Sequence, residues 1–128
     1  MIKGINHITL TVSDLRRSLT FYIEVLGFTV KRQSALSAYL VAGQLWLCLV
    51  EEAVEMKRSR DYTHIAFDVD PEDFEELQSR IKSSPAKIWQ LNSSEGPSLY
   101  FEDLDGHRLE IHVGNLKSRL DSLVEKTS

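Results

Sequence analysis

Residues 6–14 read N-H-I-T-L-T-V-S-D, and residues 63–71 read T-H-I-A-F-D-V-D-P. Both stretches alternate apolar and polar side chains, which is the period of a half-buried strand, and both end in residues that start helices. Each carries a histidine at the same place, His7 in the first stretch and His64 in the second. The repetition indicates that one supersecondary unit is used twice in this chain.

A second pair of similar stretches lies near the end of each half. Residues 43–50 read G-Q-L-W-L-C-L-V, and residues 106–113 read G-H-R-L-E-I-H-V. In each, a glycine precedes the strand, because glycine adopts the positive φ of a tight turn at no steric cost. Aligned on these glycines, Glu110 in the second half matches Leu47 in the first.

The remaining patterns complete two βαβββ modules. Period-two alternation predicts strands over residues 4–12, 28–32, 38–42, 44–50, 62–69, 87–91 and the two arms of the hairpin at 100–112. Helices are predicted after the cap at Ser13-Asp14 up to Gly27, from Asp70-Pro71 to Ser83, and over residues 114–126. We therefore expect an α+β fold. A single domain spans residues 1–128, with module one at about 4–50 and module two at about 62–113.

Length and composition limit the classes of protein that fit. The 128 residues are 42% hydrophobic and 27% charged, with a net charge of −4 and a pI near 5.5. This balance disfavours a nucleic-acid binder, since the basic run Lys57–Arg60 is short and lies in an expected linker loop at 51–61. A single cysteine, Cys48, excludes an intrachain disulfide framework and reads as a small core residue. With no apolar membrane span or secretory segment in the sequence, we expect a cytoplasmic protein.

Three residues have the types and positions of a metal site: His7, His64 and Glu110. A carboxylate in mid-strand is costly to bury unless a partner compensates it. Packing the two modules about a pseudo-twofold axis would bring both histidines to Glu110. The fourth position would be Leu47, which cannot bind a metal. Two histidines and one carboxylate with open positions suit Mn²⁺, Fe²⁺ or Zn²⁺. The alternative is that each histidine is an ordinary core or surface residue.

Two further histidines compete for this role. His112 shares the face of Glu110, but residues two apart on a strand stand about 6.6 Å apart and rarely bind one ion together. His107 lies beside the turn and is expected to hydrogen-bond within that loop.

Taken together, these motifs resemble the vicinal-oxygen-chelate superfamily of glyoxalases, bleomycin-resistance proteins and extradiol dioxygenases. The more specific stretches are residues 92–100, Trp46 and residues 61–64, and these are similar to the manganese-dependent fosfomycin-resistance thiol transferases of the glutathione type. The resemblance implies a domain-swapped homodimer that binds Mn²⁺ through His7 of one subunit and through His64 and Glu110 of the other.

The resemblance also implies a reaction, the opening of the fosfomycin epoxide by a thiol, expected to be glutathione, which confers antibiotic resistance. Thr9 would lie near the oxirane and Tyr39 would orient or activate the thiol. The residues implied in substrate binding are Trp46, Gln90, Ser94, Ser98, Tyr100 and Arg119. The residues implied in binding an activating K⁺ ion are Asn92, Ser94, Gly96 and Ser98.

Several positions depart from the pattern of this group or separate it from its sister families. Gln90 replaces a lysine that is usual beside the phosphonate, and Ser34 replaces an aromatic residue near the thiol channel. Residues 33–37 lack the glutamate that epoxide-hydrolysing relatives carry, which argues against hydrolysis. Thr9 stands where bacillithiol-using relatives tend to have cysteine. Two alternatives remain open at this point. One is a lyase, isomerase or ring-cleaving dioxygenase on another substrate, and the other is a protein that only sequesters a drug.

Overall fold

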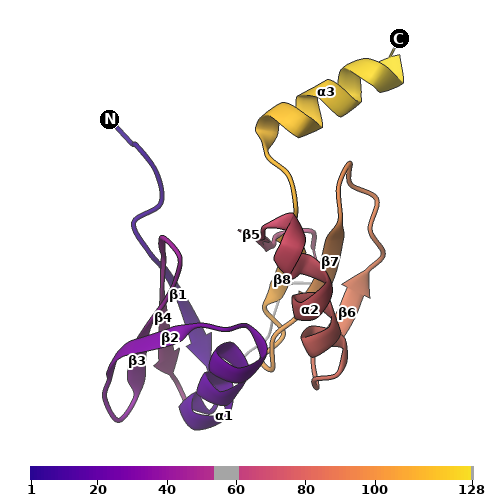
Figure 1. Cartoon of the computed structure of the whole chain (residues 1–128). Coiled ribbons are helices and arrows are strands. Elements are labelled where there is room, and N and C mark those ends of the chain that lie inside the picture. The colour runs from indigo at the N-terminus through magenta and orange to yellow at the C-terminus, as the bar shows by residue number, and fades with distance from the viewer. Residues whose placement is uncertain (54–60, 128) are drawn as a thin grey trace. The chain divides into compact units, whose positions relative to one another are not determined.

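The structure of the chain is a computed structural model that describes residues 1–53 and 61–127 (Figure 1). The chain divides into two compact units, Met1–Ser59 and Arg60–Ser128, and each unit is described by itself. The predicted linker at 51–61 is only partly covered, because residues 54–60, which include the basic run Lys57–Arg60, lie outside the described residues. Glu51 belongs to a strand and not to the linker.

The N-terminal unit contains one four-stranded sheet and one helical segment. Its elements are β1 (Ile8–Val12), α1 (Leu15–Thr20), η1 (Phe21–Val25), β2 (Thr29–Gln33), β3 (Ser37–Ala42) and β4 (Leu45–Glu51). The strand order is β1-β4-β3-β2, with β1 parallel to β4 and the other neighbours antiparallel.

The C-terminal unit repeats this topology. Its elements are β5 (Ile65–Asp68), α2 (Pro71–Lys82), β6 (Lys87–Gln90), β7 (Ser98–Glu102), β8 (Arg108–His112) and an additional helix, α3 (Leu116–Thr127). The strand order is β5-β8-β7-β6, again with the first strand parallel to the fourth. The predicted pair of βαβββ modules is therefore confirmed in the order of its helices and strands.

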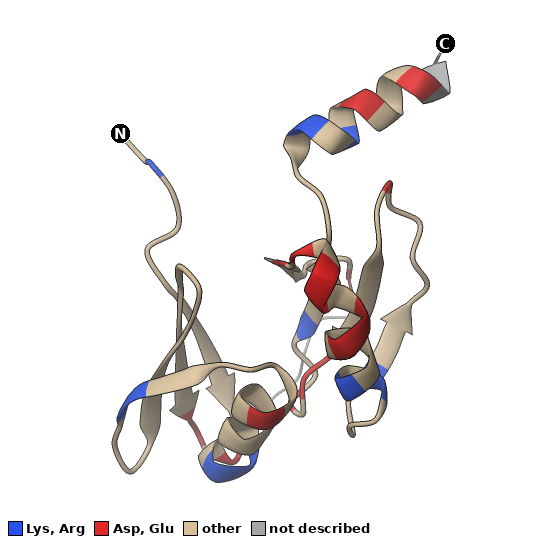
Figure 2. Ribbon diagram, in the orientation of Figure 1, with Lys and Arg blue, Asp and Glu red and all other residues tan. Residues whose placement is uncertain are grey.

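Helix starts follow the local sequence in two different ways. The side chain of Asp14 accepts a hydrogen bond from the backbone N–H of Arg17, the expected cap. Asp70 also stands at a helix start, but its side chain makes no capping bond and only its carbonyl accepts from Asp73. Instead, α2 begins with acidic residues and ends with basic ones, an order that complements the helix dipole (Figure 2).

The second half of the first helix differs from the prediction. Residues Phe21–Val25 form a π-helical turn instead of continuing the α-helix. The segment still ends at Gly27, whose φ of 82° is readily accessible to glycine. Tyr22 and Phe21 are buried in this wider turn, so the apolar stripe is retained.

Both first strands are shorter than their alternating patterns suggest. β1 begins at Ile8 and β5 at Ile65, so His7 and His64 each lie one residue before the strand. Before β5 the chain bends, because the carboxylate of Asp61 accepts from the backbone of Thr63. The two histidines thus keep equivalent places without being part of the hydrogen-bonded ladders.

Each sheet buries one face under its own helix. In the C-terminal unit, Leu109 and Ile111 of β8 are buried, as are Phe74 and Ile81 of α2. Glu110, between those two strand residues, points to the opposite face. In the N-terminal unit Leu47 and Leu49 are fully buried in the same way. The face opposite the helix is therefore where the polar residues of each unit gather.

Candidate metal and anion site

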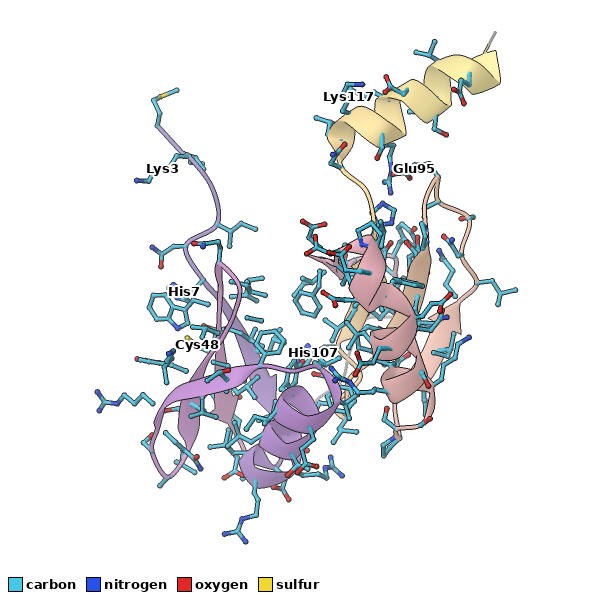
Figure 3. The ribbon with its side chains drawn as sticks, viewed as in Figure 1. Lys3, His7, Cys48, Glu95, His107 and Lys117 are labelled. Atoms are coloured by element: carbon cyan, nitrogen blue, oxygen red, sulfur yellow. The ribbon has the colours of Figure 1, made fainter. Side chains whose placement is uncertain are left out.

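Sheet register identifies the true counterpart of Glu110. Thr9 pairs with Cys48 across β1 and β4, and Ala66 pairs with Glu110 across β5 and β8. Since Thr9 and Ala66 are equivalent in the repeat, Cys48 is the equivalent of Glu110, and the assignment of Leu47 was wrong by one residue. Cys48 is buried, as expected, but on the face that bears His7 and not under the helix (Figure 3).

The error has a simple cause. Two residues join β3 to β4, whereas five join β7 to β8. Cys48 lies five positions after Gly43, whereas Glu110 lies four positions after Gly106. An alignment on the two glycines therefore pairs Glu110 with Leu47 instead of Cys48. Because side chains alternate between faces, a shift of one residue exchanges the buried face for the open one.

His64 and Glu110 form the centre of the C-terminal site. The Nε2 atom of His64 lies 3.0 Å from Oε1 of Glu110, and Nδ1 lies 2.8 Å from the carbonyl of Tyr62. A carbonyl only accepts, so the Nδ1–H of His64 donates to Tyr62 and holds the ring with Nε2 toward the carboxylate. A histidine that donates its other N–H to a carbonyl and turns Nε2 toward a carboxylate is the usual arrangement in metal sites. These residues fit a divalent metal.

The second oxygen of Glu110 begins a chain of polar contacts. Ser98 donates to Oε2 at 2.7 Å, and the Ser98 hydroxyl lies 2.5 Å from Nδ1 of His112. Nε2 of His112 lies 3.1 Å from Glu95, whose other oxygen accepts from Arg119 at 3.0 Å. His112 therefore contacts protein partners through both ring nitrogens and connects Ser98 to Glu95.

Aromatic side chains enclose His64. The rings of Tyr62, Trp89 and Tyr100 lie 4.9, 5.5 and 5.9 Å from the imidazole, centroid to centroid. Burial, followed by the negative charge of Glu110, raises the pKa of Tyr100 to about 12. The phenol of Tyr100 is therefore a hydrogen-bond donor at neutral pH.

A pocket of about 230 Å³ lies next to this centre. Its lining includes Ser94, Tyr100 and Arg119, three of the predicted phosphonate residues, together with Tyr62 and Glu95. Gln90 borders the same region, since its amide donates to the Tyr62 hydroxyl at 3.3 Å. An arginine and several hydroxyl groups around a small hollow suit a compact oxyanion.

The predicted potassium residues are also brought together. The Asn92 amide and the Ser94 hydroxyl both donate to the carbonyl of Gly96, at 2.9 and 3.0 Å. The Ser94 and Ser98 hydroxyls lie 3.1 Å apart. Carbonyl and hydroxyl oxygens of one short loop thus lie close together and hydrogen-bond to one another, and Ser98 links this loop to Glu110.

The predicted residues of the N-terminal unit form a separate group. The rings of His7 and Trp46 lie 4.5 Å apart, and those of Trp46 and Tyr39 lie 5.5 Å apart. Thr9 and Tyr39 flank Cys48 on the neighbouring strands. The indole N–H of Trp46 is buried with no hydrogen-bond acceptor within the described part of the chain.

Within residues 1–53 and 61–127 of one chain, no cluster of three or more His, Cys, Asp or Glu side chains could hold a metal ion. The C-terminal unit supplies His64 and Glu110, while His7 belongs to the other unit. Sequence reasoning missed Glu95, because its reach to α3 depends on tertiary packing and leaves no local pattern. Among the described residues, no helix combines the length and apolar character needed to cross a membrane.

Comparisons with known proteins identify the family of this chain. Residues 4–111 match the model of the glyoxalase/bleomycin resistance protein/dioxygenase superfamily. The chain is 48% identical over 129 residues to the glutathione transferase FosA of Serratia marcescens, covering 98% of this chain and 92% of that protein. It is 43% identical over 127 residues to the metallothiol transferase FosB of Staphylococcus haemolyticus, covering 94% and 90%.

Among solved structures, the fosfomycin resistance protein FosX of Listeria monocytogenes, crystallised with Mn(II) and a sulfate ion, matches with a TM-score of 0.83 and 32% identity. The match covers 96% of this chain and 99% of that one. Both the sheet topology and the sequence therefore place the chain in the glyoxalase/bleomycin resistance protein/dioxygenase superfamily, among the relatives of the fosfomycin-resistance proteins.

Proposed function

We propose that the protein is an enzyme that opens the epoxide of fosfomycin with a low-molecular-weight thiol and thereby confers resistance. The observation that carries this proposal is the position of the His64–Glu110 pair, which lies next to a pocket lined by Arg119 and hydroxyl side chains. Such a site offers one place for a divalent metal and another for a phosphonate. The FosA and FosB relatives are named as thiol-using transferases, which supports the same chemistry.

The metal is proposed to be Mn²⁺, held by His64, Glu110 and His7. The protein is proposed to be a homodimer in which His7 comes from one subunit and His64 and Glu110 come from the other. When bound, the ion supplies Lewis-acid polarisation of the epoxide oxygen. The FosX protein of Listeria monocytogenes was crystallised as a complex with Mn(II), and this supports the choice of metal. A K⁺ ion is proposed in the loop of Asn92, Ser94, Gly96 and Ser98.

The protein's own groups would perform the rest. Arg119, Ser94, Ser98 and Tyr100 hold the phosphonate oxygens, with Gln90 as a neutral donor at the pocket edge. Thr9 lies at the oxirane, and Tyr39 and Trp46 orient the thiol. The thiolate sulfur forms a bond to an oxirane carbon while the C–O bond breaks, and the freed oxygen takes up a proton. A pool of reduced thiol is found in the cytoplasm, where we place the enzyme.

The test is an adduct assay with Mn²⁺, fosfomycin and a panel of thiols that includes glutathione and bacillithiol, with and without K⁺. We expect a thioether adduct with glutathione and faster turnover with K⁺. The His64→Ala and Glu110→Ala variants should no longer bind Mn²⁺ tightly. Their rates of adduct formation should fall at least about a hundredfold, because each variant lacks a metal ligand. Turnover without any thiol, giving a diol, would instead assign the protein as an epoxide hydrolase.

A further inference from the structure

Glu95 is the one carboxylate of the pocket that none of the predicted roles uses. It lies in the loop between β6 and β7 and reaches toward α3 (Figure 3). Although the loop is at the surface, its side chain is only 8% exposed. Both oxygens are engaged, Oε1 at 3.1 Å from Nε2 of His112 and Oε2 at 3.0 Å from Nε of Arg119. A buried carboxylate with two charge-assisted partners holds a fixed orientation.

The contact to Arg119 determines how that residue can meet an anion. Its side chain is 51% exposed, and a long exposed side chain has many rotamers to lose when it binds. Glu95 takes the Nε–H and leaves the two terminal nitrogens, with four N–H donors, for an oxyanion. The guanidinium is thus held in place before the ligand arrives, which lowers the entropy cost of binding.

The contact to His112 connects the same carboxylate to the metal side of the site. His112 meets Ser98 at 2.5 Å, and Ser98 donates to Glu110 at 2.7 Å. Glu110, Ser98, His112, Glu95 and Arg119 therefore form one continuous line of polar contacts from β8 to α3. Burial alone would raise the pKa of Glu95, but hydrogen bonds from its own backbone, from Arg119 and from His112 together lower that pKa, so the carboxylate is charged at neutral pH.

We propose that Glu95 is a positioning residue for the anion site: it fixes Arg119 on α3 relative to the carboxylate of Glu110, and so sets the affinity for the phosphonate. The proposal rests on the function proposed above. It makes a distinctive prediction, because a negative charge in an anion pocket would by simple repulsion weaken binding. Positioning requires the reverse, that removing Glu95 weakens binding.

The experiment compares Mn²⁺-loaded wild type with Glu95→Ala, Glu95→Gln, Arg119→Ala and the Glu95→Ala/Arg119→Ala double variant. Glu95→Ala is expected to raise KM for fosfomycin about tenfold with kcat within about twofold, the pattern of lost uniform binding. Glu95→Gln keeps one acceptor and should fall between Glu95→Ala and wild type. In the Arg119→Ala background, Glu95→Ala should have no further effect, since the two act as one unit.

Binding of inorganic phosphate, measured by calorimetry, separates this proposal from the proposed function, because it needs no turnover. If wild type binds phosphate but does not react with fosfomycin, the function fails while the positioning role is still measured. Glu76→Ala removes an exposed glutamate of α2 and serves as the matched control. Unchanged or tighter anion binding in Glu95→Ala, or effects that simply add to those of Arg119→Ala, would overturn the proposal.

Discussion

Glu110 and Tyr100 face each other across β7 and β8, and the environment of each depends on the other. Glu110 is only 4% exposed, and its two oxygens contact His64 and Ser98. A buried carboxylate with these partners stays charged only if its surroundings stabilise that charge. The same charge, added to burial, makes ionisation of the neighbouring phenol unfavourable.

Titration of the metal-free protein should therefore separate Tyr100 from an ordinary tyrosine. Its pKa is raised from 10.0 to about 12, so the folded state favours the protonated phenol. This contribution to stability is fully present below pH 10 and is lost as the pH rises through about 12. The measurement is the phenolate absorbance of wild type minus that of Tyr100→Phe. A difference spectrum that titrates near pH 10 would contradict the assignment.

At the scale of elements, the loop between β6 and β7 borders the pocket, contacts Glu110 through Ser98 and carries the residues proposed to bind K⁺. Gly96 is essential to its path, since a Cβ there would lie 2.3 Å from the carbonyl oxygen of Val113. The Val113 carbonyl belongs to the backbone directly after β8, so it cannot move away by a change of side-chain rotamer. The loop can pass this strand end only because residue 96 has no side chain.

Gly96→Ala should consequently displace the loop. We expect a loss of stability of about 1–3 kcal/mol, the usual cost of overpacking, together with loss of any stimulation by K⁺. Thermal unfolding and the adduct assay with a K⁺ titration measure the two effects. Gly4→Ala is the control, because a Cβ at Gly4 meets no atom within 4 Å. Full K⁺ stimulation in Gly96→Ala would show that the loop is not the potassium site.

The element scale also shows what the sequence could and could not predict. Alternation and capping residues predicted the order and type of every strand, because each strand buries one face. The predicted register of β4 was wrong by one residue. A glycine in a turn indicates where the next strand begins, but it does not indicate which face of the sheet each residue of that strand occupies. The bond from Glu95 to Arg119 links a loop to a helix 24 residues further along, and no local pattern encodes such a contact.

The whole molecule is two copies of one topology with unequal ligands. The C-terminal unit holds His64 against Glu110, while the N-terminal unit presents His7 beside Trp46. If each site takes His7 from one subunit and the other two ligands from its partner, no chain needs to complete a site alone. Domain swapping of this kind has a direct genetic test.

Chains carrying His7→Ala and chains carrying Glu110→Ala should each be inactive alone. Refolded together, they should recover activity, because the mixed dimer pairs an intact His7 with an intact His64 and Glu110. The adduct assay on the mixture, with sedimentation to verify dimers, is the measurement. Two inactive variants that stay inactive when mixed would place all three ligands in a single chain.

The match between Cys48 and Glu110 has a consequence for how such a protein arose. A duplicated gene begins as two identical halves, so at this one strand position at least one half has since changed its residue. One half now carries a carboxylate beside His64, and the other carries a thiol between Thr9 and Tyr39. Divergence at a single register position is thus enough to give two modules of one topology different chemistry, with a carboxylate on the open face of one sheet and a thiol on the open face of the other.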